Sequence, residues 1–156
     1  MSDHPQQAVA GLRIAIVQAR FNSTITGMLL SGCRDTLTEA GLGGDAVEVH
    51  EAPGAWELPL VCSKLAATGR FDALIALGAV VRGETAHFDF ISSECAHGLQ
   101  RVSLETGLPV AFGVLTPENG EQAAERADPK RKNKGREVAL AALEMVAVLR
   151  EIDHGG

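Results

Sequence analysis

The chain has 156 residues, of which 46% are hydrophobic and 22% charged, and its formal net charge is −6. This length and composition suit one globular domain with a full core, and they exclude a chain that is disordered throughout. The acidic balance disfavours nucleic acid as a partner, because DNA and RNA reward basic surfaces. The first seven residues are polar, so we expect no signal peptide, no membrane span and a cytoplasmic protein.

Hydrophobic periodicity predicts a flexible tail at residues 1–10 and a single domain at 11–156, in which strands and helices alternate. The expected strands cover residues 12–19, 45–51, 71–81 and 110–115. The expected helices cover residues 23–40, 56–68, about 88–106, 118–127 and about 135–152. Strict alternation with apolar strands predicts an α/β fold, a three-layer sandwich around a four-stranded parallel sheet with a flavodoxin-like strand order.

The last expected helix is apolar on nearly every side, whereas a surface helix of a monomer would show one apolar stripe. Deep packing within the domain and a subunit interface both explain the pattern, and we favour the interface. Its large apolar residues are Val138, Leu140, Leu143, Met145, Val146, Val148 and Leu149.

The three cysteines, Cys33, Cys62 and Cys95, are far apart and form no CxxC or Cys/His cluster. We therefore expect no disulfide framework and no metal site, and a reducing compartment fits this usage.

Ligands of open parallel sheets bind beyond the carboxyl ends of the strands, which here selects the loops 20–22, 53–57, 82–88 and 116–120. In the third loop, Gly83-Glu84-Thr85 precedes a helix, where free amide groups favour an anion such as phosphate. His87 follows, and imidazole is the side chain best suited to exchange protons near neutral pH. A capping or packing role explains His87 equally well.

Two of the six aromatic residues, Phe21 and Trp56, fall on these loops. Each can stack on a planar heterocycle or plug the edge of the core. Asn22 is also explained as a helix cap, and Glu57 as an acidic residue that favours a helix N-terminus. The basic run at 130–136 indicates either a solvated hinge or a source of phosphate ligands, with Arg126 or one of the lysines reaching the anion.

Several chemistries lack their motifs. The chain has no GxGxxG after a strand, no GxxxxGK[ST] and no GxSxG, so dinucleotide, P-loop and serine-hydrolase sites are unsupported. A receiver domain would need acidic residues where this chain has Gln18-Ala-Arg20 and Val80-Val-Arg82.

Taken together, the strand-end loops resemble those of the lumazine synthase family, over about residues 11–152. The most specific element is RGxTxHF with a preceding GAV, within residues 78–88. The other matching elements are ARFN at 19–22, PGAWE at 53–57, FGVLT at 112–116, EQAAERA at 121–127 and NKGRE at 133–137.

The resemblance implies an enzyme that condenses 5-amino-6-(D-ribitylamino)uracil with 3,4-dihydroxy-2-butanone 4-phosphate, without a cofactor or metal. It implies that the pyrimidine stacks on Phe21, that Glu57 binds ribityl hydroxyls and that Phe112 comes from a neighbouring subunit. The implied pyrimidine and ribityl site comprises Phe21, Asn22, Ala55, Trp56, Glu57, Val80, Val81, Phe112, Lys134 and Glu137. The implied phosphate site comprises Glu84, Thr85 and Arg126. The implied catalytic residues are His87 as proton shuttle, Arg126 and Lys134.

The family also implies a homopentamer with active sites at subunit interfaces, and some members build 60-subunit icosahedral shells. Shell-forming members tend to carry small, glycine-rich residues where this chain has Asp128-Pro-Lys-Arg-Lys132. Two other interpretations are a non-catalytic flavin-binding relative, which predicts a degraded site, and a riboflavin synthase of the same fold. Product analysis separates the two enzymes.

Overall fold

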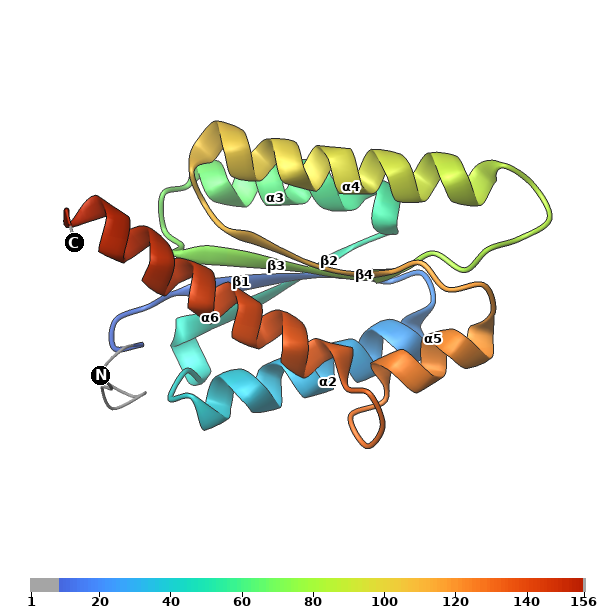
Figure 1. Ribbon diagram of the computed structural model, residues 1–156, viewed down its shortest axis with the longest axis horizontal. Coiled ribbons are helices and arrows are strands. Elements are labelled where there is room, and N and C mark those ends of the chain that lie inside the picture. Colours follow the sequence, from blue (N-terminus) through green and yellow to red (C-terminus); the bar gives the residue numbers. More distant parts are fainter. Residues whose placement is uncertain (1–8, 156) are drawn as a thin grey trace.

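A computed structural model describes residues 9–155, which form one four-stranded parallel sheet in the order β2-β1-β3-β4. The strands are Ile14–Ala19 (β1), Val47–Ala52 (β2), Ala73–Ala79 (β3) and Val110–Leu115 (β4). The helices are α2 (Ser23–Glu39), α3 (Leu58–Ala67), α4 (His87–Thr106), α5 (Gly120–Ala127) and α6 (Lys134–Asp153). Helices α2, α5 and α6 lie on one face of the sheet, and α3 and α4 lie on the other (Figure 1). The predicted α/β sandwich with a four-stranded parallel sheet is confirmed.

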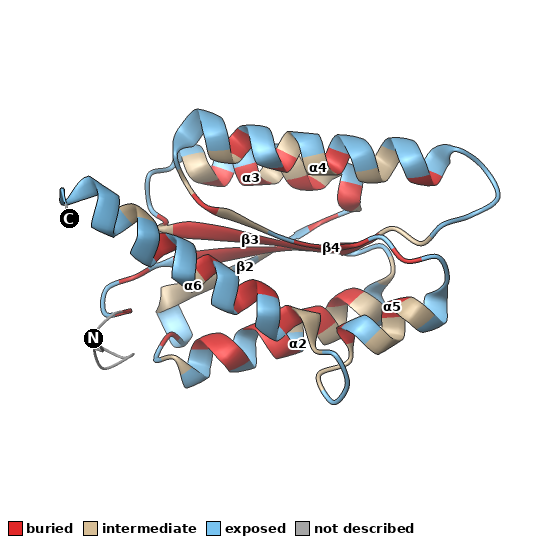
Figure 2. Ribbon diagram, viewed as in Figure 1, coloured by how far each residue is buried: buried red, intermediate tan, exposed pale blue. Residues whose placement is uncertain are grey.

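The central strands β1 and β3 are buried on both faces, because each face is covered by helices, whereas the outer strands β2 and β4 are partly exposed (Figure 2). Ile14 and Ile16 of β1 pack in the core under α2 and α6, while Ala15 and Val17 pack in the core under α3 and α4. All seven positions of the central strand β3 are buried. This explains why β1 and β3 are nearly continuous apolar runs in the sequence, whereas β2 alternates apolar and polar residues.

Some predicted boundaries shift for local reasons. The strand predicted at 71–81 is shorter at both ends and covers only Ala73–Ala79. Asp72, just before β3, links β3 to two other elements instead of extending the strand. Its Oδ2 atom accepts the Arg13 backbone N–H at 2.8 Å, and its Oδ1 atom lies 3.7 Å from Nη2 of Arg150, near the end of α6. The helix predicted at 56–68 begins as a 3-10 turn, Ala55–Glu57, before α3 starts with Pro59 in its first turn.

The tail predicted at residues 1–10 differs from the structure at its end. Residues 1–8 lie outside the described part of the chain. Val9 is buried and belongs to the core under α2 and α6, and its carbonyl accepts the Leu12 N–H at 3.0 Å. The packed domain therefore includes Val9, because this isolated apolar side chain reaches the core.

Helices α2 and α6 approach each other closely at two glycines. A Cβ atom added to Gly135 would lie 2.2 Å from the Leu29 carbonyl oxygen and 2.9 Å from the Cys33 nitrogen. A Cβ atom added to Gly32 would lie 2.1 Å from Oδ1 of Asn133. This contact fixes the start of α6 against α2.

Helix α6 carries two apolar stripes. One stripe, with Val138, Ala139, Ala142 and Val146, is buried against α2 and the sheet. The other stripe stays exposed and comprises Leu140, Met145, Val148 and Ile152. Deep packing therefore explains half of the pattern, and the second stripe is available to a partner. No helix within residues 9–155, α6 included, is long and apolar enough to cross a membrane.

Candidate active site

A hollow of about 500 Å³ opens beyond the carboxyl ends of β1 and β3, at the point where the strand order reverses. This is the place where open α/β sheets bind ligands. We call it the aromatic hollow. Its lining residues are Phe21, Asn22, Pro53, Gly54, Ala55, Trp56, Glu57, Ala79, Val80, Val81, Gly83, Thr85, His87, Phe88 and Ile91.

Phe21 and Trp56 present their rings to this hollow and not to the core. Phe21 is 71% exposed and Trp56 is 56% exposed, so neither plugs the edge of the sheet. Trp56 sits in the 3-10 turn Ala55–Glu57, which follows β2. Exposed aromatic faces beside a cavity are suited to stacking on a planar ligand.

Asn22 joins the ends of two strands. It occupies the N-cap position of α2 with φ 65°, and its side chain makes no capping hydrogen bond. Its Nδ2 atom instead donates to the Ala79 carbonyl at 2.8 Å. Asn22 therefore occupies the predicted cap position, but its side chain does not cap the helix. A non-glycine residue with left-handed backbone is uncommon and costs free energy, and such residues cluster at functional sites.

The extended backbone that follows β3 leaves one amide, that of Val81, facing the aromatic hollow. The Val80 N–H donates to the Leu115 carbonyl at 2.8 Å, and the Arg82 N–H donates to the Pro117 carbonyl at 3.0 Å. Because successive amides of an extended strand point to opposite sides, the Val81 amide between them points away from β4. Val81 lines the aromatic hollow, so this amide is placed to meet a ligand there.

His87 is the first residue of α4 and lines the aromatic hollow together with Gly83 and Thr85. The His87 N–H donates to Oγ1 of Thr85 at 3.3 Å, which caps the start of the helix. His87 is exposed, so it is not a packed core histidine. Glu84 is exposed as well, but it lines neither this hollow nor the second hollow, which lies beside β4.

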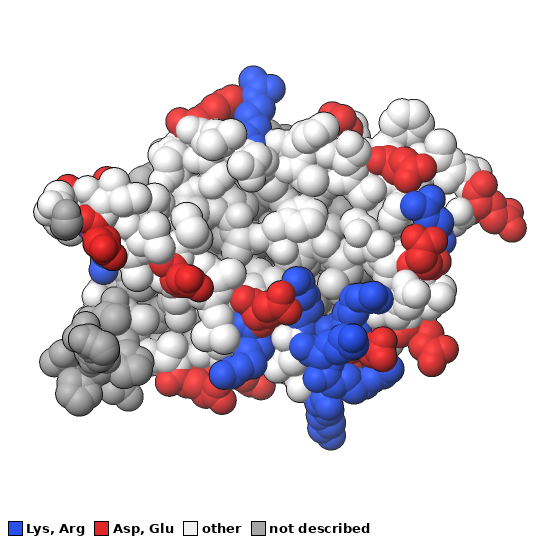
Figure 3. Space-filling model, viewed as in Figure 1, with Lys and Arg blue, Asp and Glu red and all other residues white. Residues whose placement is uncertain are grey.

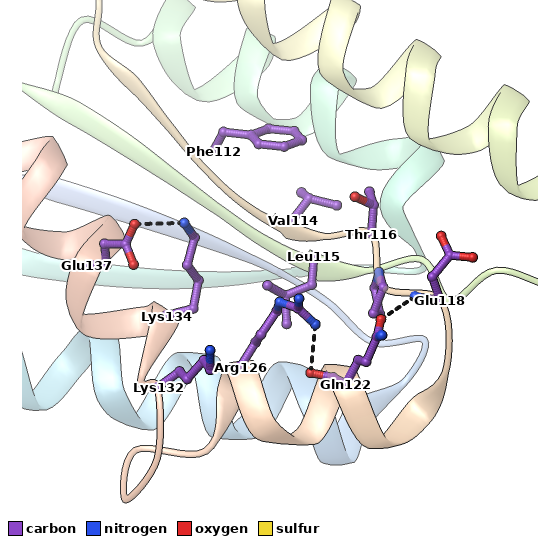
Figure 4. A pocket seen from close by; sticks show the side chains of 11 residues that line it. Phe112, Val114, Leu115, Thr116, Glu118, Gln122, Arg126, Lys132, Lys134 and Glu137 are labelled. Carbon is purple, nitrogen blue, oxygen red and sulfur yellow. Dashed lines mark hydrogen bonds and ion pairs between the residues drawn. The ribbon is translucent and has the colours of Figure 1, made fainter.

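A second hollow, of about 610 Å³, lies between β4, α5 and the start of α6 (Figure 4). We call it the basic hollow. Its lining residues are Phe112, Val114, Leu115, Thr116, Pro117, Glu118, Gln122, Arg126, Lys132, Lys134 and Glu137. Phe112 is 43% exposed on the edge strand β4.

The basic hollow holds positive charge that the chain does not neutralise. Lys134 Nζ lies 2.9 Å from Glu137 Oε1, so this lysine is paired. Within residues 9–155, Arg126 and Lys132 form no ion pair, and Arg126 donates only to the Gln122 backbone carbonyl at 3.4 Å. Figure 3 shows lysine and arginine side chains gathered over this part of the surface. Although the chain is acidic overall, the arrangement suits an anion.

The predicted site residues divide between the two hollows. Phe112, Arg126, Lys134 and Glu137 line the basic hollow, and every other predicted residue except Glu84 lines the aromatic hollow. One chain therefore does not bring Arg126 and Thr85 into one phosphate site. Reasoning from the sequence missed Gln122, which lines the basic hollow one helical turn before Arg126. The spacing of four residues on one helix could have indicated it.

The described residues contain no group of three or more His, Cys, Asp or Glu side chains arranged to hold a metal ion. The chemical groups that line the two hollows are an imidazole, carboxylates, ammonium and guanidinium groups, and aromatic faces.

Comparison with known proteins identifies the family. The sequence profile of 6,7-dimethyl-8-ribityllumazine synthase matches residues 11–150. The chain belongs to the 6,7-dimethyl-8-ribityllumazine synthase family. It is 50% identical over 142 residues to the 6,7-dimethyl-8-ribityllumazine synthase of Syntrophus aciditrophicus (strain SB), which covers 91% of this chain and 92% of the relative. Membership in this family makes the chain a transferase of riboflavin biosynthesis.

Proposed function

We propose that the chain performs the reaction of its family at a site formed where the aromatic hollow of one copy meets the basic hollow of the next. This reaction condenses 5-amino-6-(D-ribitylamino)uracil with 3,4-dihydroxy-2-butanone 4-phosphate, and it gives 6,7-dimethyl-8-ribityllumazine, phosphate and water. The observation that carries the proposal is the division of the expected site residues between two separate hollows of one chain.

The aromatic hollow binds the pyrimidine. Its ring stacks on Phe21, a contact that is worth about 0.5–1.5 kcal/mol for an aromatic pair. Asn22, the Val80–Val81 backbone and the backbone at Ala55–Trp56 hold the polar edges of the ring. Glu57 accepts hydrogen bonds from the ribityl hydroxyls. The orientation of the Val81 amide and the exposure of Phe21 support these roles.

The sugar phosphate lies between the two hollows. The backbone amides at Glu84–Thr85, at the start of α4, and the guanidinium of Arg126 from the neighbouring copy hold its phosphate. Phe112 of that copy closes the pyrimidine pocket, and Lys134 and Glu137 complete the site. Arg126, which forms no ion pair within residues 9–155, and the position of Phe112 on an edge strand support this arrangement.

The reaction consists mostly of proton transfers around two bond-forming steps. The pyrimidine amine attacks the ketone, water leaves and an imine forms. Phosphate then departs, and the helix-end amides and Arg126 stabilise its charge. Loss of phosphate leaves an enol that tautomerises to a second carbonyl. The nitrogen that carries the ribityl chain attacks this carbonyl, a second water leaves and the ring closes. His87 moves the protons, which suits an imidazole, and holding both substrates together supplies much of the rate.

The assembly is a homopentamer in this proposal, with five equivalent sites at the interfaces. The exposed stripe of α6 (Leu140, Met145, Val148) and the open edge of β4 support a contact surface between copies. Light scattering is expected to give at least about 82 kDa, five times the 16.4 kDa of one chain. A 60-subunit shell would give about 980 kDa, and a monomer would contradict the shared site.

Three free, buried thiols support a cytoplasmic location.

Mixing two impaired variants tests the shared site, in an assay at a sugar-phosphate concentration well below the raised KM of Arg126→Ala. His87→Ala damages the aromatic hollow, and Arg126→Ala damages the basic hollow. When both chains are co-expressed in equal amounts in a head-to-tail ring, about a quarter of the interfaces combine two intact hollows. We expect activity to return to about that fraction of wild type, measured as equal amounts of fluorescent lumazine and free phosphate. If each site belonged to one chain, the mixture would be only as active as the average of its two parts.

A further inference from the structure

The side chain of Arg82 connects the two hollows within one chain. Its Nε atom lies 3.0 Å from Oε1 of Glu118, which lines the basic hollow. Its Nη1 atom lies 3.6 Å from Oδ1 of Asp89, and its guanidinium carbon lies 4.3 Å from the ring centroid of Phe88. Phe88 and Asp89 directly follow His87 in the first turn of α4.

These contacts join the beginning of a loop to its end. β3 ends at Ala79, the loop 83–86 follows Arg82, and helix α4 begins at His87. All four residues of this loop are exposed. A Cβ atom added to Gly83 would meet nothing within 4 Å, so the start of the loop does not pack against the domain. Arg82 itself is anchored, because its backbone N–H donates to the Pro117 carbonyl at 3.0 Å. The Arg82 side chain then reaches across the base of the loop to Phe88 and Asp89.

We propose that Arg82 is a positioning residue, which holds the 83–86 loop and His87 in the orientation that meets the sugar phosphate. The inference rests on the proposed function, because it assigns roles to Thr85 and His87 in that reaction. Arginine suits the task since its planar group stacks on an aromatic ring and still donates to carboxylates on two sides. Lysine, as a point charge, keeps the attraction but loses the stacked, forked geometry.

The residue acts on the position of the loop more than on folding. Its partners Glu118 and Asp89 are exposed, and exposed ion pairs contribute little to stability. A displacement of about 1 Å at reacting groups, however, lowers rates by up to about 100-fold. Loss of the Arg82 side chain therefore affects turnover strongly and the melting temperature weakly.

The test compares Arg82→Met with a matched control, Arg101→Met. Arg101 forms an exposed ion pair with Glu105 on α4, and neither residue lines a hollow. We expect Arg82→Met to lower kcat by about 10- to 100-fold and to raise KM for the sugar phosphate. The Kd of the pyrimidine alone, measured by fluorescence titration, stays within about twofold, since stacking on Phe21 is retained. Arg82→Lys falls between wild type and Arg82→Met, and Arg101→Met matches wild type. If Arg82→Met also matched wild type, the inference would be overturned.

A double variant shows whether Arg82 acts through His87. If Arg82 only positions that residue, adding Arg82→Met to His87→Ala lowers kcat much less than it does in the wild-type background. Full multiplication of the two effects would overturn the part of the inference that concerns His87, because Arg82 would then act independently of that residue. Asp89→Asn serves as a second variant if Arg82→Met fails to fold, and a smaller effect in the same direction is expected. A His87→Ala variant with unchanged turnover would instead contradict the proposed function itself.

Discussion

Replacing Gly135 with alanine tests the close contact between α2 and α6. The added Cβ would meet the Leu29 carbonyl oxygen at 2.2 Å, whereas ordinary contact begins at 3.4 Å. The start of α6 must therefore retreat from α2 by about 1.2 Å. Overpacking costs about 1–3 kcal/mol, and the upper end applies here because both neighbours, Leu29 and Cys33, contribute backbone atoms that no rotamer change can move.

A loss of about 3 kcal/mol lowers the thermal midpoint of a chain of this size by roughly 6–12 °C. The retreat also displaces Lys134 and Glu137, which line the basic hollow on either side of Gly135. We expect turnover to fall about tenfold or more, since small errors of position are costly at reacting groups.

Gly27→Ala is the matched control. Gly27 also lies in a helix, α2, and a Cβ atom added there would meet nothing within 4 Å. Alanine improves helix propensity at both positions, by up to about 1 kcal/mol, so Gly27→Ala should raise the midpoint by roughly 2–4 °C. The opposite signs of the two effects isolate the contact between the helices.

Circular dichroism melts at one fixed protein concentration measure both shifts, because assembly makes the midpoint depend on concentration. We expect the midpoints of Gly135→Ala and Gly27→Ala to differ by roughly 8 °C or more. A difference of less than about 2 °C would refute the close contact of α6 with Leu29.

The remaining predictions concern the two hollows and the buried thiols. His87→Ala should lower turnover by about 10²–10⁴-fold, read from lumazine fluorescence, and unchanged turnover would remove His87 from the mechanism. Arg126→Ala should raise KM for the sugar phosphate by about 10- to 100-fold, the loss of one or two charged hydrogen bonds; an unaltered KM and kcat would exclude it as the phosphate ligand. Burial raises the pKa of Cys33 and Cys62 to about 12 and of Cys95 to about 11, against an ordinary 9.0. Above about pH 9 the folded state keeps thiol protons that the unfolded chain loses. The thiols' contribution to the free energy of unfolding is therefore fully present below about pH 9 and is lost as the pH rises above it. Urea midpoints at pH 7.5 and 10 measure this fall, and equal midpoints would contradict it.

The strand-end loops could be predicted from the sequence because a parallel sheet sends the carboxyl ends of all its strands to one edge. Apolar runs identified the strands, and the loops that follow them contain Phe21, Trp56 and His87. The exposed positions of Phe21 and Trp56 then excluded the alternative in which they plug the core.

Features that depend on long-range contacts could not be predicted in this way. Asn22 has the residue type and position of a helix cap, but its left-handed backbone directs the side chain to Ala79, 57 residues away. The contact of Arg82 with Glu118 joins two loops that no local pattern relates. The separation of the hollows depends on where α5 and α6 pack beside β4, and helix periodicity does not encode this placement.

Asp72 lies at the amino-terminal ends of the strands, on the side of the sheet opposite the hollows. It accepts the Arg13 N–H before β1 and pairs with Arg150 near the end of α6. Helix α6 runs from the basic hollow to this edge, so its last turn leaves the domain far from the loops beyond the carboxyl ends of the strands (Figure 1). A fluorescent label or an affinity tag joined after α6 would therefore emerge away from the substrate entrance of the chain that carries it. Attachment to a sensor surface through this end would keep both hollows away from that surface.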